Sequence, residues 1–250
     1  FEAIGGEVVS VMLLEISKKK PSSTTEIISL DATSTTLALD KEYLLRSLGT
    51  SVLSQESQLN NPDFAITMVG KNSSGRLGDL IDSYHGITTT DLPRFSRFVW
   101  EASCWNDDWN LQQSVGIANC HYSGRESVVL WEHGKGGIKA LRDSGATVVI
   151  TGLDAWGHQG ITINRMNLCA SLYDGHSFDT GIAVLVPRDN VYLSAIWAFC
   201  FSPQFAELLK TLLCNSMVVE YVYFPKVPFD LPHWTQVAAE KYPNGLPKPY

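Results

Sequence analysis

The distribution of apolar and polar residues along the chain predicts several β-strands and several short helices. Short runs rich in β-branched and aromatic residues are typical of strands. Five such runs lie in the second half of the chain: 126–131, 146–152, 160–164, 181–187 and 218–224. Because strands cluster in one region and helices in another, the pattern favours an α+β fold over a wound α/β sheet.

Capping residues and apolar spacing predict the helices. Asp40 is expected to cap a helix that runs to about Leu48, with Gly49 as its stop. Residues 190–213 are expected to form two helices, and the second of them should be capped by Ser202 and begin at Pro203. Further short helices are predicted over three segments: 52–59, 77–84 and 138–143.

The first residues and one polar segment define the expected domain organisation. Residues 1–16 are expected to form a strand buried on both faces, because 8–16 are apolar at nearly every position. A chain that opens within such a strand is expected to be a piece of a longer protein. The polar stretch 71–75 predicts a hinge, so we expect one domain over 1–70 and a second over 71–250.

Composition and charge narrow the class of protein. The chain has 250 residues, 44% of them hydrophobic, which is ample for a sizeable core. Its net charge of −7 means that binding to nucleic acid would need a local basic patch. Five cysteines without a C-x-x-C pair predict buried free thiols, not a disulfide framework or a zinc site. The longest apolar run, 191–201, is too short to cross a bilayer, so a cytoplasmic protein is expected.

Signatures of catalysis are missing from the sequence. It contains no H-E-x-x-H, G-x-S-x-G, phosphate-loop or G-x-G-x-x-G motif. Residues 133–137 (HGKGG) predict a plain turn, because no Ser or Thr follows Lys135. Asp174, His176 and Asp179 also indicate a turn, since such acidic turns are far commoner than metal sites. We predict neither catalytic residues nor a metal site.

Cationic and polar side chains among aromatic residues are the remaining candidates for function. Thr, Arg and Lys donors suit phosphate oxygens, whereas Gln, His and Arg on a loop suit base edges. The candidate DNA contacts are Thr88, Thr89, Arg94, Arg97, Arg125, Lys135, His158, Gln159 and Arg165. The alternative is that these are ordinary surface charges with stems packed on aromatic rings, which the acidic net charge favours. Trp156 is expected to pack in the core.

Several segments resemble a family of long single-chain bacterial DNA adenine methyltransferases, found in type II-G restriction–modification and BREX-like phage-defence systems. FEAIGGEVV (1–9) resembles the end of their catalytic domain. HGITTTDLPRFSRFVWE (85–101) resembles their Gly-x-Thr-Thr-Gly-Asp-Asn-x-Arg-Phe-x-Arg segment, although Thr90 replaces a Gly and Leu92 an Asn. The segments 124–136, 155–187 and 222–250 also resemble the target-recognition region of the family.

The resemblance implies a specific fold and role. The second domain would carry a curved, mostly antiparallel sheet with helices packed at one end, as in target-recognition domains of methylase specificity subunits. It would bind duplex DNA sequence-specifically beside the upstream methyltransferase domain of the same polypeptide. The Asn-Pro-Pro-Tyr motif and the glycine-rich S-adenosylmethionine motif are absent here, so this chain is expected to hold no cofactor, with S-adenosylmethionine bound by the parent enzyme. The alternative is an interaction module that docks onto a partner protein of a defence complex without touching DNA.

Overall fold

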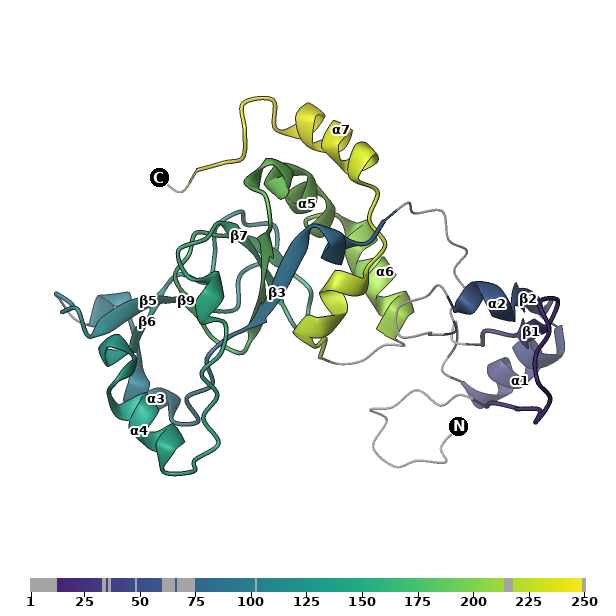
Figure 1. The fold of residues 1–250 in the computed structure, drawn as a ribbon, viewed down its shortest axis with the longest axis horizontal. Helices are drawn as coiled ribbons and strands as arrows, with labels where there is room; N and C mark the ends of the chain where they lie inside the picture. Colours follow the sequence, from purple (N-terminus) through teal and green to yellow (C-terminus); the bar gives the residue numbers. More distant parts are fainter. Residues whose placement is uncertain are drawn as a thin grey trace. The chain divides into compact units, whose positions relative to one another are not determined.

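The computed structural model describes residues 13–32, 35, 37–47, 49–59, 66, 75–101, 103–213 and 218–248. The chain divides into two compact units, one formed by 1–72 with 211–216 and the other by 73–210 with 217–250. The fold is α+β, with 34% helix and 23% strand, as the sequence predicts (Figure 1). Three mostly antiparallel sheets take the place of the single curved sheet that we expected, and none of them is closed over the described residues.

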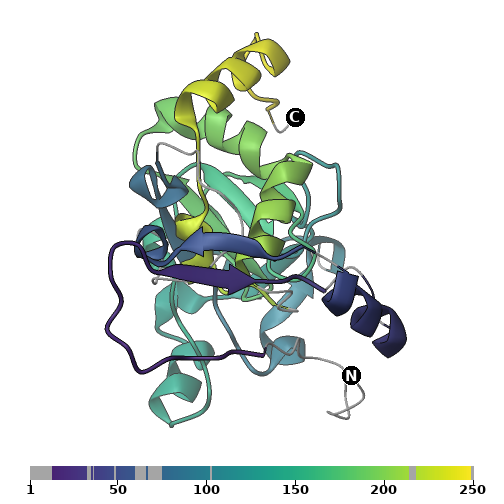
Figure 2. The ribbon, with the colours of Figure 1, turned by 90° about the vertical axis from the view of Figure 1, so that its right-hand side faces the viewer.

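The first unit contains a two-stranded sheet and two short helices. Its sheet pairs β1 with β2 in antiparallel fashion, so that Ile27 lies opposite Leu53 (Figure 2). The elements are β1 Glu26–Ser29, α1 Ala38–Ser47, β2 Ser51–Ser54 and α2 Gln55–Gln58. The helix expected over 52–59 is therefore wrong in its first half, because its apolar residues pair with β1 and the Ser54 side chain caps only α2.

The strand expected over residues 1–16 lies mostly outside the described residues. Its described end, 13–16, is not a strand, and Leu13 is fully exposed there. None of the described residues between 13 and 59 is buried. Apolar side chains such as Leu13, Ile16 and Ile28 are exposed, whereas Ile27 and Leu53 of the sheet are half-buried.

The second unit holds two four-stranded sheets, and the first of them is entirely antiparallel. Its strands, in spatial order, are β3 Ile81–His85, β10 Ile182–Pro187, β7 Gly160–Asn164 and β8 Ala170–Tyr173. Every residue of β7, β8 and β10 is buried. The strands predicted at 160–164 and 181–187 are thus confirmed. The helix expected over 77–84 is only a 3-10 turn, η2 Leu77–Asp79, which leads into β3.

Two short helices pack against the second four-stranded sheet. Its strands are β4 Ser96–Phe98, β6 Ser127–Leu130, β5 Trp109–Gln113 and β9 Ser177–Phe178, with only β5 and β9 parallel. Helices α3 Leu92–Phe95 and α4 Gly137–Asp143 contribute Phe95 and Ile138 to one core cluster with Val129 of β6. The strand predicted at 126–131 and the helix predicted at 138–143 are confirmed. The strand expected at 146–152 is reduced to an isolated bridge between Val149 and Thr88.

Three helices complete the second unit. They are α5 Leu193–Cys200, α6 Pro203–Leu213 and α7 Leu231–Lys241, and α5 lies beside α7 (Figure 1). The buried Phe199 ring lies within 5.2 Å, centre to centre, of Phe205, Phe229 and Trp234. The pair of helices predicted over 190–213 is confirmed, including the start at Pro203.

Short 3-10 turns connect the elements: η3 Val99–Glu101, η4 Glu132–Gly134, η5 Leu153–Ala155, η6 Asn190–Tyr192 and η7 Tyr221–Lys226. The strand expected at 218–224 is wrong, because η7 takes its place and contains Pro225, which cannot donate to a ladder. Of the helices that the structure describes, none has the length and apolar character needed to cross a membrane.

Candidate nucleic-acid interface

The turn that follows η5 is fixed by two glycines from distant parts of the chain. Gly157 has a φ of 79° and donates its N–H to the Gly175 carbonyl at 2.9 Å. A Cβ on Gly175 would lie 2.8 Å from the Gly157 backbone, so only glycine allows this approach. The contact leaves the next two side chains, His158 and Gln159, exposed.

The base of the same turn is anchored by tryptophan. Trp156 is partly buried, packs against the core cluster of Ala155 and Phe178, and meets Trp131 edge to face at 5.1 Å. It is therefore a packing residue, as the sequence predicts. His158 and Gln159 therefore extend from a turn whose preceding residue is packed against the core.

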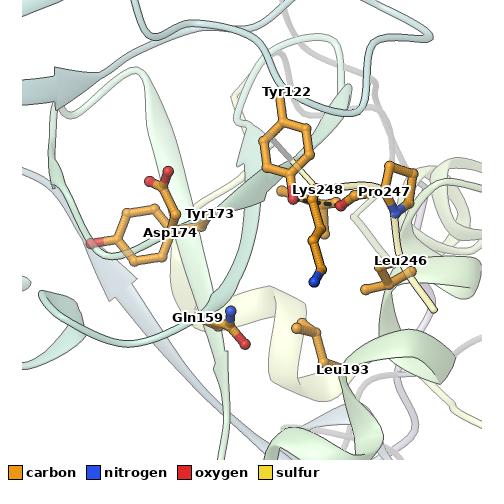
Figure 3. Close-up of a pocket in the computed structure, with 9 residues that line it drawn as sticks. Tyr122, Gln159, Tyr173, Asp174, Leu193, Leu246, Pro247 and Lys248 are labelled. Atoms are coloured by element: carbon orange, nitrogen blue, oxygen red, sulfur yellow. Dashed lines mark hydrogen bonds between the residues drawn. The ribbon is translucent and has the colours of Figure 1, made fainter. Parts of the chain in front are cut away.

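A pocket of about 340 Å³ lies beside Gln159 (Figure 3). Its apolar part consists of Leu172, Leu193, Leu246 and Pro247. Its polar part consists of Tyr122, Gln159, Tyr173, Asp174 and Lys248. In Figure 3 the Lys248 side chain points into this pocket, toward Gln159 and Leu193. The pocket therefore joins the turn to a segment some 90 residues further along the chain.

Arg125 lies next to the pocket but is engaged within the protein. Its Nη1 pairs with Asp174 at 2.6 Å, its Nη2 donates to the Leu172 carbonyl at 3.2 Å, and its guanidinium covers the Tyr122 ring at 4.4 Å. His176 faces the other carboxylate oxygen of Asp174 at 3.4 Å. Arg125 thus supports the wall of the pocket, and these contacts direct its guanidinium toward the protein.

A second group of predicted residues lies around α3 and α4. Arg94 is exposed, with its guanidinium 4.9 Å from the centre of the Phe95 ring, and Lys135 is exposed just before α4. Thr88 is half-buried and pairs through its backbone with Val149. Arg94 and Lys135 are the members of this group with solvent-facing charges.

Three residues predicted as DNA contacts are buried or engaged within the protein. Arg165 is buried, and its guanidinium binds Glu220 at 2.5 Å and the carbonyls of Val219 and Thr180. Thr89 is buried as well. Arg97 donates from Nη1 to the carbonyls of Pro93 and Ser96, so it braces the corner between α3 and β4. These side chains hold the fold together.

The carboxylates of 174–179 do not converge. Asp179 accepts hydrogen bonds from the Ser114 hydroxyl and from the Gly181 N–H, away from the Asp174–His176 pair. Burial raises the pKa of Asp179 above its usual value, although both hydrogen bonds oppose that rise. Within the described ranges, no three His, Cys, Asp or Glu side chains are placed to hold a metal ion.

The cysteines differ from the expectation in part. Cys104, Cys120, Cys169 and Cys200 are free, but only Cys200 is buried, and burial raises the pKa of its thiol. Cys104 is exposed. Cys214 lies outside the described residues.

Sequence reasoning missed two members of the site, Tyr122 and Lys248. Tyr122 lies in no recognised segment, and Lys248 lies within 222–250 but is not a predicted contact; only the folded chain brings both to Gln159. The chain matches no known family model and no curated protein.

Proposed function

We propose that this chain is the target-recognition part of a bacterial, cytoplasmic DNA adenine methyltransferase of the type II-G or BREX-like group, and that it binds duplex DNA. The observation that carries the proposal is the turn at 157–159. Its glycine-locked backbone presents an imidazole and an amide to solvent, and such groups read base edges in a groove. A fixed turn is suited to reading, because side chains on a rigid base lose little entropy on binding.

Arg94 and Lys135 support the same proposal as phosphate contacts. Neither has a carboxylate partner among the described residues, so their charge is available to a polyanion. Contacts to phosphates position a protein on DNA and carry no sequence information. The parent enzyme would supply S-adenosylmethionine and the flipped-base pocket through its upstream domain, and this chain would select the site.

The test compares the salt dependence of DNA binding by single variants. Arg94→Ala should weaken binding to all duplexes alike and reduce the log–log salt slope by about one unit. Gln159→Ala should cost about 1–3 kcal/mol on the preferred duplex and leave other duplexes unaffected. Arg46→Ala is the matched control, since Arg46 is also exposed but lies on α1 and pairs with Glu42 at 2.9 Å.

Arg97→Ala should lower the melting temperature and leave the salt slope of DNA binding unchanged. Equal slopes for the Arg94 and Arg46 variants would count against the assignment.

A protein partner is the second candidate, and one observation favours it. Phe98 and Trp100 are 49% and 65% exposed and stack on each other, with ring centres 4.7 Å apart and planes 5° apart. Exposed aromatic pairs are enriched at protein interfaces. If a Phe98→Ala, Trp100→Ala double variant lost a protein partner and kept its DNA affinity, the interaction module would be the better description.

A further inference from the structure

We propose that the C-terminal tail, residues 242–248, is part of the DNA-contacting surface and that Lys248 binds a phosphate beside the base contacted by Gln159. This inference rests on the proposed function. It adds to that function a contact residue that the sequence did not indicate.

The tail is held at both ends by side chains of the second unit. The buried Trp197 donates from its ring N–H to the Tyr242 hydroxyl at 2.9 Å. Gly245, with a φ of 84°, closes a turn by donating its N–H to the Tyr242 carbonyl at 3.0 Å. Further on, the Tyr122 hydroxyl donates to the Pro247 carbonyl at 2.7 Å. The backbone on either side of Leu246 is thus tied to the protein.

The anchored tail places the Lys248 side chain beside the turn at 157–159. Leu246 and Pro247 form one wall of the pocket, and the Lys248 side chain points along it toward Gln159 (Figure 3). Lys248 is exposed. The nearest acidic group in the pocket, Asp174, is already paired with Arg125 at 2.6 Å. The ammonium group therefore remains unneutralised by any carboxylate that the structure describes.

The two side chains have complementary chemistry for DNA. A lysine ammonium is a compact point charge that binds a phosphate without demanding a fixed geometry. A glutamine amide both donates and accepts, which suits a base edge. A chain with a net charge of −7 gains binding to DNA only where cations gather, and Lys248 adds one at the turn that presents Gln159.

The contact is tested with Lys248→Ala and with Lys241→Ala as its matched control. Lys241 is another exposed lysine, at the end of α7 and seven residues earlier. Affinity for a mixed-sequence duplex is measured by fluorescence anisotropy on the full chain over a series of salt concentrations. Lys248→Ala should reduce the log–log slope by about one unit, and Lys241→Ala should leave the slope unchanged.

The positioning of the tail is tested with Tyr122→Phe, which removes only the hydroxyl that holds Pro247. It should reproduce part of the loss seen with Lys248→Ala and add nothing in the Lys248→Ala background. An unchanged slope for Lys248→Ala, with Gln159→Ala still losing its preferred duplex, would overturn the tail contact and leave the proposed function standing. Tighter binding by Lys248→Ala would also overturn it, because the tail would then act as a lid over Gln159. If the wild-type chain bound no duplex at all, the proposed function itself would fail.

Discussion

At the scale of single residues, Asp179 shows how burial and hydrogen bonding compete at one carboxyl group. Burial raises its pKa above the ordinary 3.8, and the hydrogen bonds from Ser114 and Gly181 lower it, with burial the larger effect. A raised pKa in the native state means that the folded protein holds this proton to a higher pH than the unfolded chain. The contribution of Asp179 to the free energy of unfolding should therefore fall as the pH rises above about 3.8.

This behaviour predicts a pH-dependent difference between Asp179→Asn and the wild type. Because the amide does not ionise, the variant should lack the fall in stability, and its stability relative to the wild type should increase as the pH rises from 3.8. Ser114→Ala should extend the fall to higher pH, since it removes a hydrogen bond that favours the carboxylate. Urea unfolding across this pH range measures both effects. Parallel pH profiles for wild type and Asp179→Asn would contradict the prediction.

Arg165 illustrates what residue types alone cannot show. In the sequence it is a cation that follows a predicted strand, and its residue type alone does not distinguish it from the exposed Arg94. Its ionic partner, Glu220, lies 55 residues away, and the structure buries the guanidinium among carbonyls that the sequence does not mark. Arg94 remains exposed because its neighbour Phe95 points into the core cluster and leaves the cation outside.

At the scale of elements, runs of β-branched and aromatic residues predicted the strands at 126–131, 160–164 and 181–187, but similar runs at 146–152 and 218–224 did not form strands. The buried segments at 160–164 and 182–187 consist mainly of Ile, Val and Thr. The strand β5 reads as polar, yet Gln112 and Gln113 are buried, and the Gln113 amide donates to the carbonyls of Ser123 and Leu172. Such a strand has no periodic apolar signal, because the carbonyls that satisfy its buried Gln113 amide lie 10 and 59 residues further along the chain. For α7 a signal existed and was overlooked, since the Asp230 side chain caps the helix through the His233 N–H.

The backbone of the turn at 157–159 predicts a loss of stability when Gly175 is replaced by alanine. Gly175→Ala should destabilise the protein and loosen this turn, because the new Cβ would meet the Gly157 backbone at 2.8 Å. Gly145→Ala is the control, as Gly145 also has a positive φ, of 89°, but has no atom within 4 Å of the new Cβ. The control should lose about 1–2 kcal/mol from the unfavourable φ alone. Gly175→Ala should lose about 1–3 kcal/mol more from overlap. Urea unfolding measures both losses, and equal losses would show that the contact between the glycines does not matter.

At the scale of the whole molecule, the buried apolar residues belong to one part of the chain. Every buried hydrophobic residue that the structure describes lies between Leu77 and Ala238. The first unit contributes a two-stranded sheet and two short helices, and none of its residues between 13 and 59 with described burial is buried. An isolated two-stranded sheet is marginally stable in water. The stability of the second unit is therefore expected to come from its own two sheets and the aromatic cluster around Phe199.

Removing residues 1–72 tests that expectation directly. The shortened chain should keep its near-ultraviolet circular dichroism and a melting temperature close to that of the full chain, because no described core residue is lost. It should also scatter less light at high concentration, since exposed apolar side chains such as Leu13 and Ile16 leave with the segment. Retention of the Gln159-dependent DNA preference by the shortened chain would show that the turn and the tail need only the second unit. A shortened chain without a cooperative unfolding transition would mean that the second unit depends on residues 1–72 for its stability.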